Sequence, residues 1–244
     1  SLSQYAAVGN GTFQAAAIPS RESYIMQNPF TFAISPNTPI EENIKLVVTS
    51  ATNGVTMSTD TVSIIVGMPT YMFVDTTNNP NTNWTITATP SNPKWEATTS
   101  SFYSSPNSYT DSKSGSYSNN ATVTLTSTNP ISLAGFSSPK LVFWTKYDIE
   151  SNWDYGQVEI STNNGSSWTA LHGLYTEPGT GSFQPNGQPV YDGAKNNWVR
   201  EEINLSQYGG AEVKIRFKLR SDGYITKDGW YLDDIGILVY TAVP

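Results

Sequence analysis

The sequence predicts an all-β protein with two sandwich-like domains, and composition, hydrophobic periodicity and length support this expectation. Aromatic residues make up 12% of the chain and charged residues only 14%, while 18 Gly and 15 Pro accompany many Ser, Thr and Asn. This mixture is typical of many short strands joined by turns, so long helices are not expected. The 244 residues can hold one large β domain or two ordinary ones, and we expect two.

The clearest periodicity lies in residues 141–149, LVFWTKYDI. Apolar or aromatic side chains occupy most of both alternating sets, which predicts a strand that is covered on both faces. Further along, residues 157–163 and 166–171 flank Asn164-Gly165. This pair readily supplies the positive φ angles of a two-residue type I′ turn. The stretch therefore predicts a central strand followed by a hairpin.

Residues 1–68 predict a small antiparallel sandwich. Its apolar or alternating segments are residues 12–18, 24–34, 44–50 and 61–66. Turn formers such as Asn53-Gly54 separate them. An immunoglobulin-like (Ig-like) domain has about seven strands, so this module either lacks its first strands or completes itself on a partner surface. Gly67-Met68-Pro69 ends the last segment and places the domain boundary after residue 68.

Residues 69–244 form the second predicted domain, in which strands alternate with long loops. Besides the central strand and hairpin, strands are expected at residues 70–75, 121–127, 198–205, 213–220 and 230–240. Residues 76–120 and 172–197 are rich in turn formers and are expected to be long loops. Residues 213–220 alternate between apolar and basic side chains, which predicts one core face and one solvated basic face.

Charge and cysteine content exclude several kinds of partner and site. The formal net charge is −7, which disfavours binding to nucleic acid or to an anionic membrane surface. There is no cysteine for a disulfide, a thiolate metal site or a nucleophile. No apolar run approaches the roughly 20 residues that span a bilayer, so membrane insertion is not expected. Because the chain starts at Ser1 without Met, we expect a processed product or a piece of a longer protein.

The last predicted strand carries the most informative carboxylates. Both of its alternating faces are apolar, so Asp233 or Asp234 is expected near a core. A buried carboxylate needs a metal, hydrogen bonds or a counter-charge. Calcium is one reading, because it accepts carboxylate and amide oxygens. The other is a carboxylate that caps loop N–H groups or pairs with Arg200, Arg216 or Lys146.

A catalytic site is not expected. The single histidine, His172, lies in a turn-rich region, and no nucleophile or orienting group accompanies it. No HExxH zinc motif is present. A pair of carboxylates for glycoside cleavage would need an acid with a raised pKa, and the sequence identifies none.

The seven tryptophans suggest either a core or a sugar-binding surface. They are Trp84, Trp95, Trp144, Trp153, Trp168, Trp198 and Trp230. Those inside predicted strands, at positions 144, 168 and 230, are expected in the core. Trp153, Tyr155 and Trp95 lie in predicted loops and are the candidates for exposed binding contacts. A carbohydrate-binding or adhesin-type module would be favoured if these three lined one groove.

Several segments also resemble a known family. They include FVDTTNNPNTNW, SPNSYTDSKSGSY, LVFWTKYDIESNWDYGQVEISTNNGSSW, VKIRFKLRSDG and DGWYLDDIGI. In this order they resemble the C-terminal jelly-roll region of large secreted bacterial peptidases. The nearest resemblance is to the non-catalytic tail of zinc carboxypeptidases. Immune inhibitor A-type peptidases and MAM-like or cleaved-adhesin modules are wider relatives.

The resemblance implies a fold, a location and a set of calcium ligands. Residues 69–244 would form a MAM-like or galactose-binding-like jelly roll, and residues 1–68 an Ig-like module. Calcium would bind at Asp75, Asp111 and Asp233 or Asp234. The fragment would be a non-catalytic, secreted or cell-surface accessory region whose partner is the peptidase domain of the same polypeptide. Protein or cell-wall glycan would be its external partner.

Overall fold

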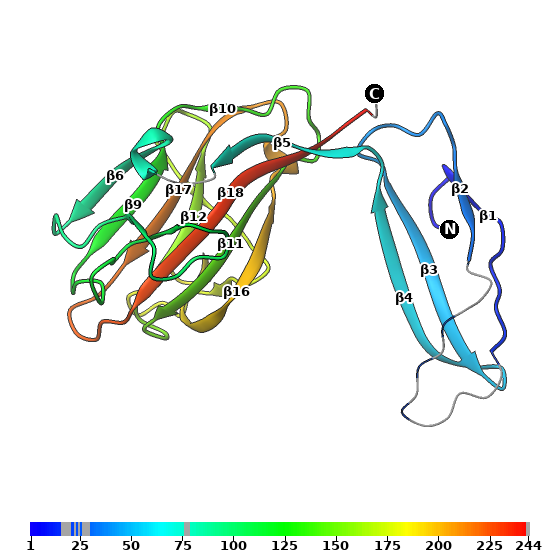
Figure 1. Cartoon of the computed structure of the whole chain (residues 1–244), viewed down its shortest axis with the longest axis horizontal. Coiled ribbons are helices and arrows are strands. Elements are labelled where there is room, and N and C mark those ends of the chain that lie inside the picture. The colour runs from blue at the N-terminus through cyan, green and yellow to red at the C-terminus, as the bar shows by residue number, and fades with distance from the viewer. Residues whose placement is uncertain (16–20, 22, 24, 26–29, 76–78, 243–244) are drawn as a thin grey trace. The chain divides into compact units, whose positions relative to one another are not determined.

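The computed structural model describes residues 1–15, 21, 23, 25, 30–75 and 79–242. It is all-β, as the sequence predicts, and divides into two compact units (Figure 1). One unit is Ser1–Pro69 together with Tyr240–Pro244, and the other is Thr70–Val239. The boundary predicted from the sequence instead lies after residue 68, with residues 240–244 in the second domain.

Two antiparallel ribbons make up the strands of the first unit. Strand β1 (Ala6–Val8) pairs with β2 (Phe32–Ile34), and β3 (Asn43–Thr52) pairs with β4 (Val55–Ile65). Asn53 and Gly54 join β3 to β4 with φ angles of 50° and 80°, which suit a tight hairpin turn. The predicted segments 12–18 and 24–34 lie partly outside the described residues. Within the part described, four strands form two separate sheets, so the Ig-like assignment stays a prediction.

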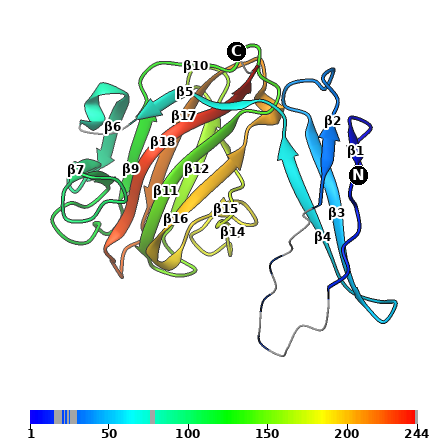
Figure 2. The same cartoon turned by 45° about the vertical axis from the view of Figure 1, so that its right-hand side comes forward.

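Two antiparallel sheets form the second unit (Figures 1 and 2). The first sheet has the order β13 (Thr169–Ala170), β12 (Tyr155–Ser161), β17 (Glu212–Arg220), β9 (Thr122–Ser127) and β6 (Trp84–Thr89), with β10 (Ile131–Ser132) beside β17. The second has the order β16 (Gly193–Asn204), β11 (Lys140–Ile149), β18 (Gly229–Thr241), β8 (Ser108–Thr110) and β7 (Glu96–Thr98), with β5 (Met68–Asp75) on β18. The remaining elements are a ribbon of β14 (Glu177–Pro178) and β15 (Pro189–Val190) and the 3₁₀ turns η1 (Pro80–Thr82) and η2 (Ser206–Tyr208).

The predicted central strand is confirmed as β11, which lies between β16 and β18. Its core-facing side chains and those of β17 meet in the apolar interior, where Phe143 and Phe217 pack edge to face with ring centroids 5.2 Å apart. Trp230 is also fully buried and packs against Tyr191 and Trp95. Large aromatic side chains therefore fill the space between the sheets, and their burial is a main source of stability.

Both predicted long loops contain strands. Residues 76–120 contain β6, β7 and β8, and residues 172–197 contain β14, β15 and the start of β16. Strand β6 has the sequence WTITAT, in which threonines rather than apolar residues fill one face. Threonine is β-branched and suits a strand, but its hydroxyl lowers the apolar contrast on which the periodicity argument depends.

The predicted two-residue hairpin at Asn164-Gly165 is longer than expected. Both residues have positive φ, at 56° and 90°, but β12 ends at Ser161 and β13 begins at Thr169. The Ser161 hydroxyl accepts the Gly165 N–H at 2.8 Å, and Asn163 Oδ1 accepts the Ser167 N–H at 2.9 Å. These side-chain bonds compete with the strand ladder and stabilise a wider loop.

Candidate functional site

The three aromatic residues predicted to make exposed contacts do not form one surface. Trp153 is 45% exposed, but Trp95 and Tyr155 are buried, so the prediction for these two is wrong. Trp95 packs against Trp230 with ring centroids 6.0 Å apart, and Phe183 lies over Tyr155 at 6.1 Å. Trp95 also lines an opening of about 620 Å³ bounded by residues of β6 and β7, although its own ring is covered.

Three tryptophans, at positions 144, 168 and 230, were predicted to lie in strands and in the core, and of these only Trp230 is in the core. Trp144 is half-buried and stacks on Tyr103, with ring centroids 3.5 Å apart. Trp168 is also half-buried and precedes β13 rather than lying within it. Its ring lies under the Arg216 guanidinium, at 4.1 Å from the ring centroid, which is a cation–π contact.

Asp233 is an anchor for a loop. It is buried on β18, and its Oδ2 accepts the N–H groups of Tyr103 at 2.8 Å and Ser104 at 2.9 Å. Its Oδ1 accepts the N–H of Asp234 at 2.9 Å. Burial raises the pKa of Asp233, and the backbone hydrogen bonds oppose that rise. Of the two readings that the sequence left open, capping of loop N–H groups matches these contacts.

Asp234 lies beside this anchor at an irregularity of the ladder. The register between β11 and β18 shifts between Val142 and Trp144, and Asp234 has a φ of 46° there. Its Oδ2 accepts the Ser104 hydroxyl at 2.6 Å. Both neighbouring carboxylates therefore hold the same loop, one through backbone N–H groups and one through a hydroxyl.

Asp75 and Asp111 lie in separate buried surroundings. Asp75 accepts the Trp84 indole N–H and the Tyr109 hydroxyl, the latter at 3.2 Å. Asp111 Oδ1 accepts the Trp230 N–H at 2.6 Å, while its Oδ2 has no hydrogen-bond partner within the described part of the chain. Burial raises the pKa of Asp111 to about 7.

These four aspartates do not fit one shared calcium site. Among the described residues, none of the four belongs to a group of three acidic, His or Cys side chains whose ligand atoms lie close enough to share one ion. Calcium needs six to eight oxygen ligands, whereas Asp233 already accepts hydrogen bonds on both oxygens. Calcium binding at Asp75, Asp111, Asp233 or Asp234 therefore stays a prediction.

Another acidic group, which was not predicted from the sequence, has this geometry. Glu150, Asp154 and Asp222 each offer a carboxylate oxygen, and these three atoms lie within 4.8 Å of one another. Asp222 is 68 residues from Asp154, so sequence spacing carries no signal of their proximity. A signal exists only once the pairing of β12 with β17 is known, because that pairing places residue 155 opposite residue 220.

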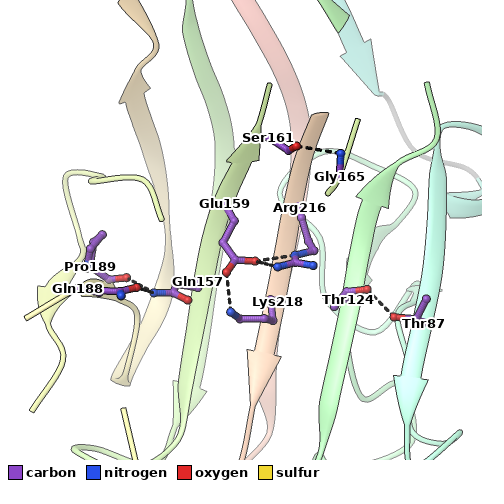
Figure 3. A network of polar contacts seen from close by, with 10 residues as sticks. All are labelled: Thr87, Thr124, Gln157, Glu159, Ser161, Gly165, Gln188, Pro189, Arg216 and Lys218. Atoms are coloured by element: carbon purple, nitrogen blue, oxygen red, sulfur yellow. Dashed lines mark hydrogen bonds and ion pairs between the residues drawn. The ribbon is translucent and has the colours of Figure 1, made fainter. Parts of the chain in front are cut away.

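The outer face of the first sheet, here called the polar sheet face, is a second candidate site. It comprises Thr85, Thr87, Thr124, Thr126, Gln157, Glu159, Lys214, Arg216 and Lys218, which share one side because directly paired residues do. Figure 3 shows its polar network. Glu159 accepts hydrogen bonds from Arg216 Nε and Lys218 Nζ, both at 2.6 Å.

The basic side of β17 is thus not the freely solvated face that the sequence predicts. The Glu159 carboxylate is buried and is shared by two cations, whose side chains are only 22% and 15% exposed. Burial lowers the pKa of Lys218, and the neighbouring Glu159 opposes that change. Next to this pair, Gln157 Nε2 donates to the Pro189 carbonyl at 3.2 Å, and the hydroxyls of Thr87 and Thr124 lie 2.7 Å apart (Figure 3).

The two antiparallel sheets, their shared apolar interior and the polar outer face define a β-sandwich module. Residues 97–242, more than half of the chain, match the family model described as immune inhibitor A-like, MAM domain. The chain belongs to this family.

Curated relatives carry peptidase or immune inhibitor names. Bacillopeptidase F of Bacillus subtilis (strain 168) is 31% identical over 127 residues, which are 52% of this chain and 8% of that protein. Pre-pro-metalloprotease PrtV of Vibrio cholerae serotype O1 (strain M66-2) is 27% identical over 45% of this chain and 11% of its own length. Immune inhibitor A of Bacillus thuringiensis subsp. alesti is 27% identical over 44% and 14%. The chain therefore matches a small part of each relative.

Solved structures with a similar fold include adhesin and carbohydrate-binding domains. The K3 cleaved adhesin domain of Lys-gingipain from Porphyromonas gingivalis W83 is 18% identical with a TM-score of 0.42, covering 70% of this chain and 99% of that one. The CBM22-1 xylan-binding domain of Paenibacillus barcinonensis Xyn10C is 13% identical with a TM-score of 0.41, covering 72% and 99%. In the described part of the chain, no helix is long and apolar enough to cross a membrane.

Proposed function

We propose that the chain is a non-catalytic accessory region of a secreted bacterial peptidase, which supports or positions the catalytic domain of the same polypeptide. The observation that carries this proposal is the family match over residues 97–242. The matched relatives are far longer than the match, and the shared region is only 8% of Bacillopeptidase F and 14% of immune inhibitor A. Most of each relative, with room for a separate catalytic domain, lies outside it.

Three finer parts of the proposal rest on the sequence resemblance. The parent peptidase would be a zinc carboxypeptidase, although the relatives named above carry other peptidase names. Residues 1–68 would be an Ig-like module that precedes the sandwich. Calcium would add stability, because an ion that binds only the folded state raises the free energy of unfolding by mass action.

Several polar contacts of the second unit agree with a non-catalytic, structural role. The buried aspartates Asp75 and Asp233 accept hydrogen bonds from other segments, and Glu159 pairs with Arg216 and Lys218 of β17. The only histidine, His172, is exposed. In these contacts the polar groups stabilise strands and loops.

Deleting residues 70–239 from the full-length parent tests this function. We expect the truncated parent to be exported less, or to lose peptidase activity per exported molecule. The matched control deletes residues 1–68 and keeps the sandwich. Unchanged export, activity and substrate range after loss of the sandwich would contradict the proposal.

A second candidate function is glycan binding on the polar sheet face. The half-buried Trp168 lies beside this face under Arg216, and an aromatic ring next to hydrogen-bonding groups is an arrangement that suits a sugar. We expect retention on insoluble polysaccharide, reduced at least about tenfold by Trp168→Ala. Trp198→Ala, at a half-buried tryptophan on β16 of the other sheet, is the matched control. Equal retention of the two variants would exclude this face as the binding surface.

A further inference from the structure

Three carboxylates converge at the end of the sandwich where the chain passes between the sheets. Glu150 directly follows β11 of the second sheet, and Asp154 directly precedes β12 of the first. Asp222 follows β17 and lies beyond the same end of the β12–β17 pair as Asp154, because Tyr155 is opposite Arg220. Asn152, with a φ of 67°, turns the short connection between Glu150 and Asp154. One carboxylate oxygen from each residue lies within 4.8 Å of the other two.

Asp154 is the buried member of this group. Its side chain is fully buried, and its Oδ1 accepts the Asp222 N–H at 2.6 Å. Its Oδ2 is also buried and has no hydrogen-bond partner among the described residues. Glu150 Oε2 is likewise buried and has no hydrogen-bond partner among the described residues. A buried carboxylate oxygen without a hydrogen-bond donor destabilises the folded state. Asp233 avoids this cost because both of its oxygens accept backbone N–H groups.

The surrounding protein supplies little compensation for the charge. No Lys or Arg nitrogen within the described ranges forms an ion pair with any of the three carboxylates. The charge of Lys227 lowers the pKa of Glu150 without forming an ion pair, and a hydrogen bond from the Tyr117 hydroxyl lowers the pKa of Asp154. Burial and the neighbouring acidic groups nevertheless raise the pKa of both Glu150 and Asp154. The group therefore has an excess of negative charge and free acceptor oxygens.

We propose that Glu150, Asp154 and Asp222 bind one divalent cation of the size of calcium. Three carboxylate oxygens are ligands for a hard cation, and calcium lies about 2.3–2.6 Å from each of its oxygens. Two oxygens on opposite sides of such an ion are about 4.8 Å apart, which is the upper limit of the separations found here. Water and loop carbonyl groups would complete the shell. The ion would link the β11–β12 turn to the β17–β18 loop and so join the two sheets.

This site is separate from the positions at which the family resemblance implies calcium. It also does not depend on the proposed function, since an accessory region and a glycan-binding module would both gain stability from it. The two calcium hypotheses can be distinguished by substitution, because no residue is shared between them.

The test is a titration of the chelator-treated chain with CaCl₂, and in parallel with MgCl₂, by calorimetry and thermal melting. We expect one calcium ion per chain at this site and a rise in Tm. Asp154→Asn, Asp222→Asn and Glu150→Gln should each weaken calcium binding at least about tenfold. Asn at position 154 keeps an Oδ1 acceptor for the Asp222 N–H, so the variant retains that hydrogen bond. Asp111→Asn is the control for the family-implied positions and should bind calcium as the unmodified chain does.

A second readout separates loss of the site from loss of the fold. In excess chelator, each of the three variants should melt at the same temperature as the unmodified chain or higher, because one repelling buried charge is gone. In excess calcium, the unmodified chain should melt at a higher temperature than each of the three variants. The proposal is overturned if CaCl₂ produces neither heat nor a rise in Tm, whatever MgCl₂ does. It is equally overturned if the three variants keep calcium affinity, or if Asp111→Asn alone loses it.

Discussion

Asp233 and Asp154 are both fully buried aspartates of the same sandwich, yet their surroundings give them opposite roles. Both oxygens of Asp233 accept backbone N–H groups, and the residue holds a loop that is 130 positions away in the sequence. Asp154 has one N–H donor, the Tyr117 hydroxyl nearby and two acidic neighbours, and its Oδ2 has no hydrogen-bond partner by geometry in the described part of the chain. The comparison teaches that burial alone does not define a site, because the donors around a carboxylate decide whether it is an anchor or a ligand.

The largest expected effect is the loss of stability when Asp233, the anchor, is replaced. Asp233→Ala removes the buried acceptor for the N–H groups of Tyr103, Ser104 and Asp234 and leaves all three donors without it. We expect the free energy of unfolding to fall by about 3 kcal/mol, measured by urea denaturation. Asp233→Asn keeps one carbonyl acceptor and should lose less. A loss below about 1 kcal/mol for the alanine variant would show that Asp233 is not an anchor.

Asp111 is another buried aspartate of this sandwich, and its raised pKa predicts that the stability of the chain depends on pH. Its pKa is about 7 in the folded chain against 3.8 for the ordinary side chain, with burial as the main cause and Asp228 adding to it. Between these values the folded state holds a proton that the unfolded state has lost. Its stabilising contribution is therefore full below pH 3.8 and is lost as the pH rises through about 7.

We expect stability in chelator to fall by up to about 1.4 kcal/mol per pH unit across that window because of Asp111. Asp111→Asn should remove this contribution, and urea denaturation between pH 4 and pH 8 measures it. Glu150 and Asp154, whose pKa values are also raised, add slope of the same sign that remains in this variant. Equal slopes in the two proteins would contradict the prediction.

Glu159 is a third case, in which side-chain cations rather than N–H groups hold the buried carboxylate. Glu159→Gln leaves Arg216 and Lys218 without their counter-charge. Since both cations are partly exposed, we expect a loss of only about 1–2 kcal/mol, smaller than for a fully buried pair. Lys140→Met, which removes a partly exposed partner of Glu202, is the comparison variant and should cost less. A double-mutant cycle with Arg216→Met measures the coupling directly, and a coupling near zero would contradict the proposed pairing energy.

The smallest expected effect separates hydroxyl from backbone donors. Ser104→Ala removes the hydroxyl that donates to Asp234 Oδ2 at 2.6 Å and leaves the Ser104 N–H on Asp233 in place. Because Asp234 is only partly buried, we expect a loss of about 0.5–1 kcal/mol in urea denaturation. A loss as large as that of Asp233→Ala would mean that the hydroxyl, and not the backbone N–H groups, holds the loop.

Local sequence predicted the parts of the fold that depend on near neighbours. The alternation in residues 141–149 and 213–220 identified β11 and β17. The two apolar faces of the last strand predicted that Asp233 or Asp234 lies near a core, and Asp233 does. Strand β6 was missed because threonine fills one of its faces. Asn164 and Gly165 were identified as a turn, but the length of the loop depends on hydrogen bonds from Ser161 and Asn163.

The sequence by itself determined the all-β class, the principal strands and the resemblance to peptidase tails, since these depend on side-chain alternation, turn residues and ordered motifs. Only the tertiary structure decided which side chains are exposed and which carboxylates meet. Trp95 and Tyr155 are buried because Trp230 and Phe183 cover them, and Asp222 reaches Asp154 because β17 pairs with β12. Burial and proximity are properties of contacts between segments far apart in the chain, so no local pattern contains them.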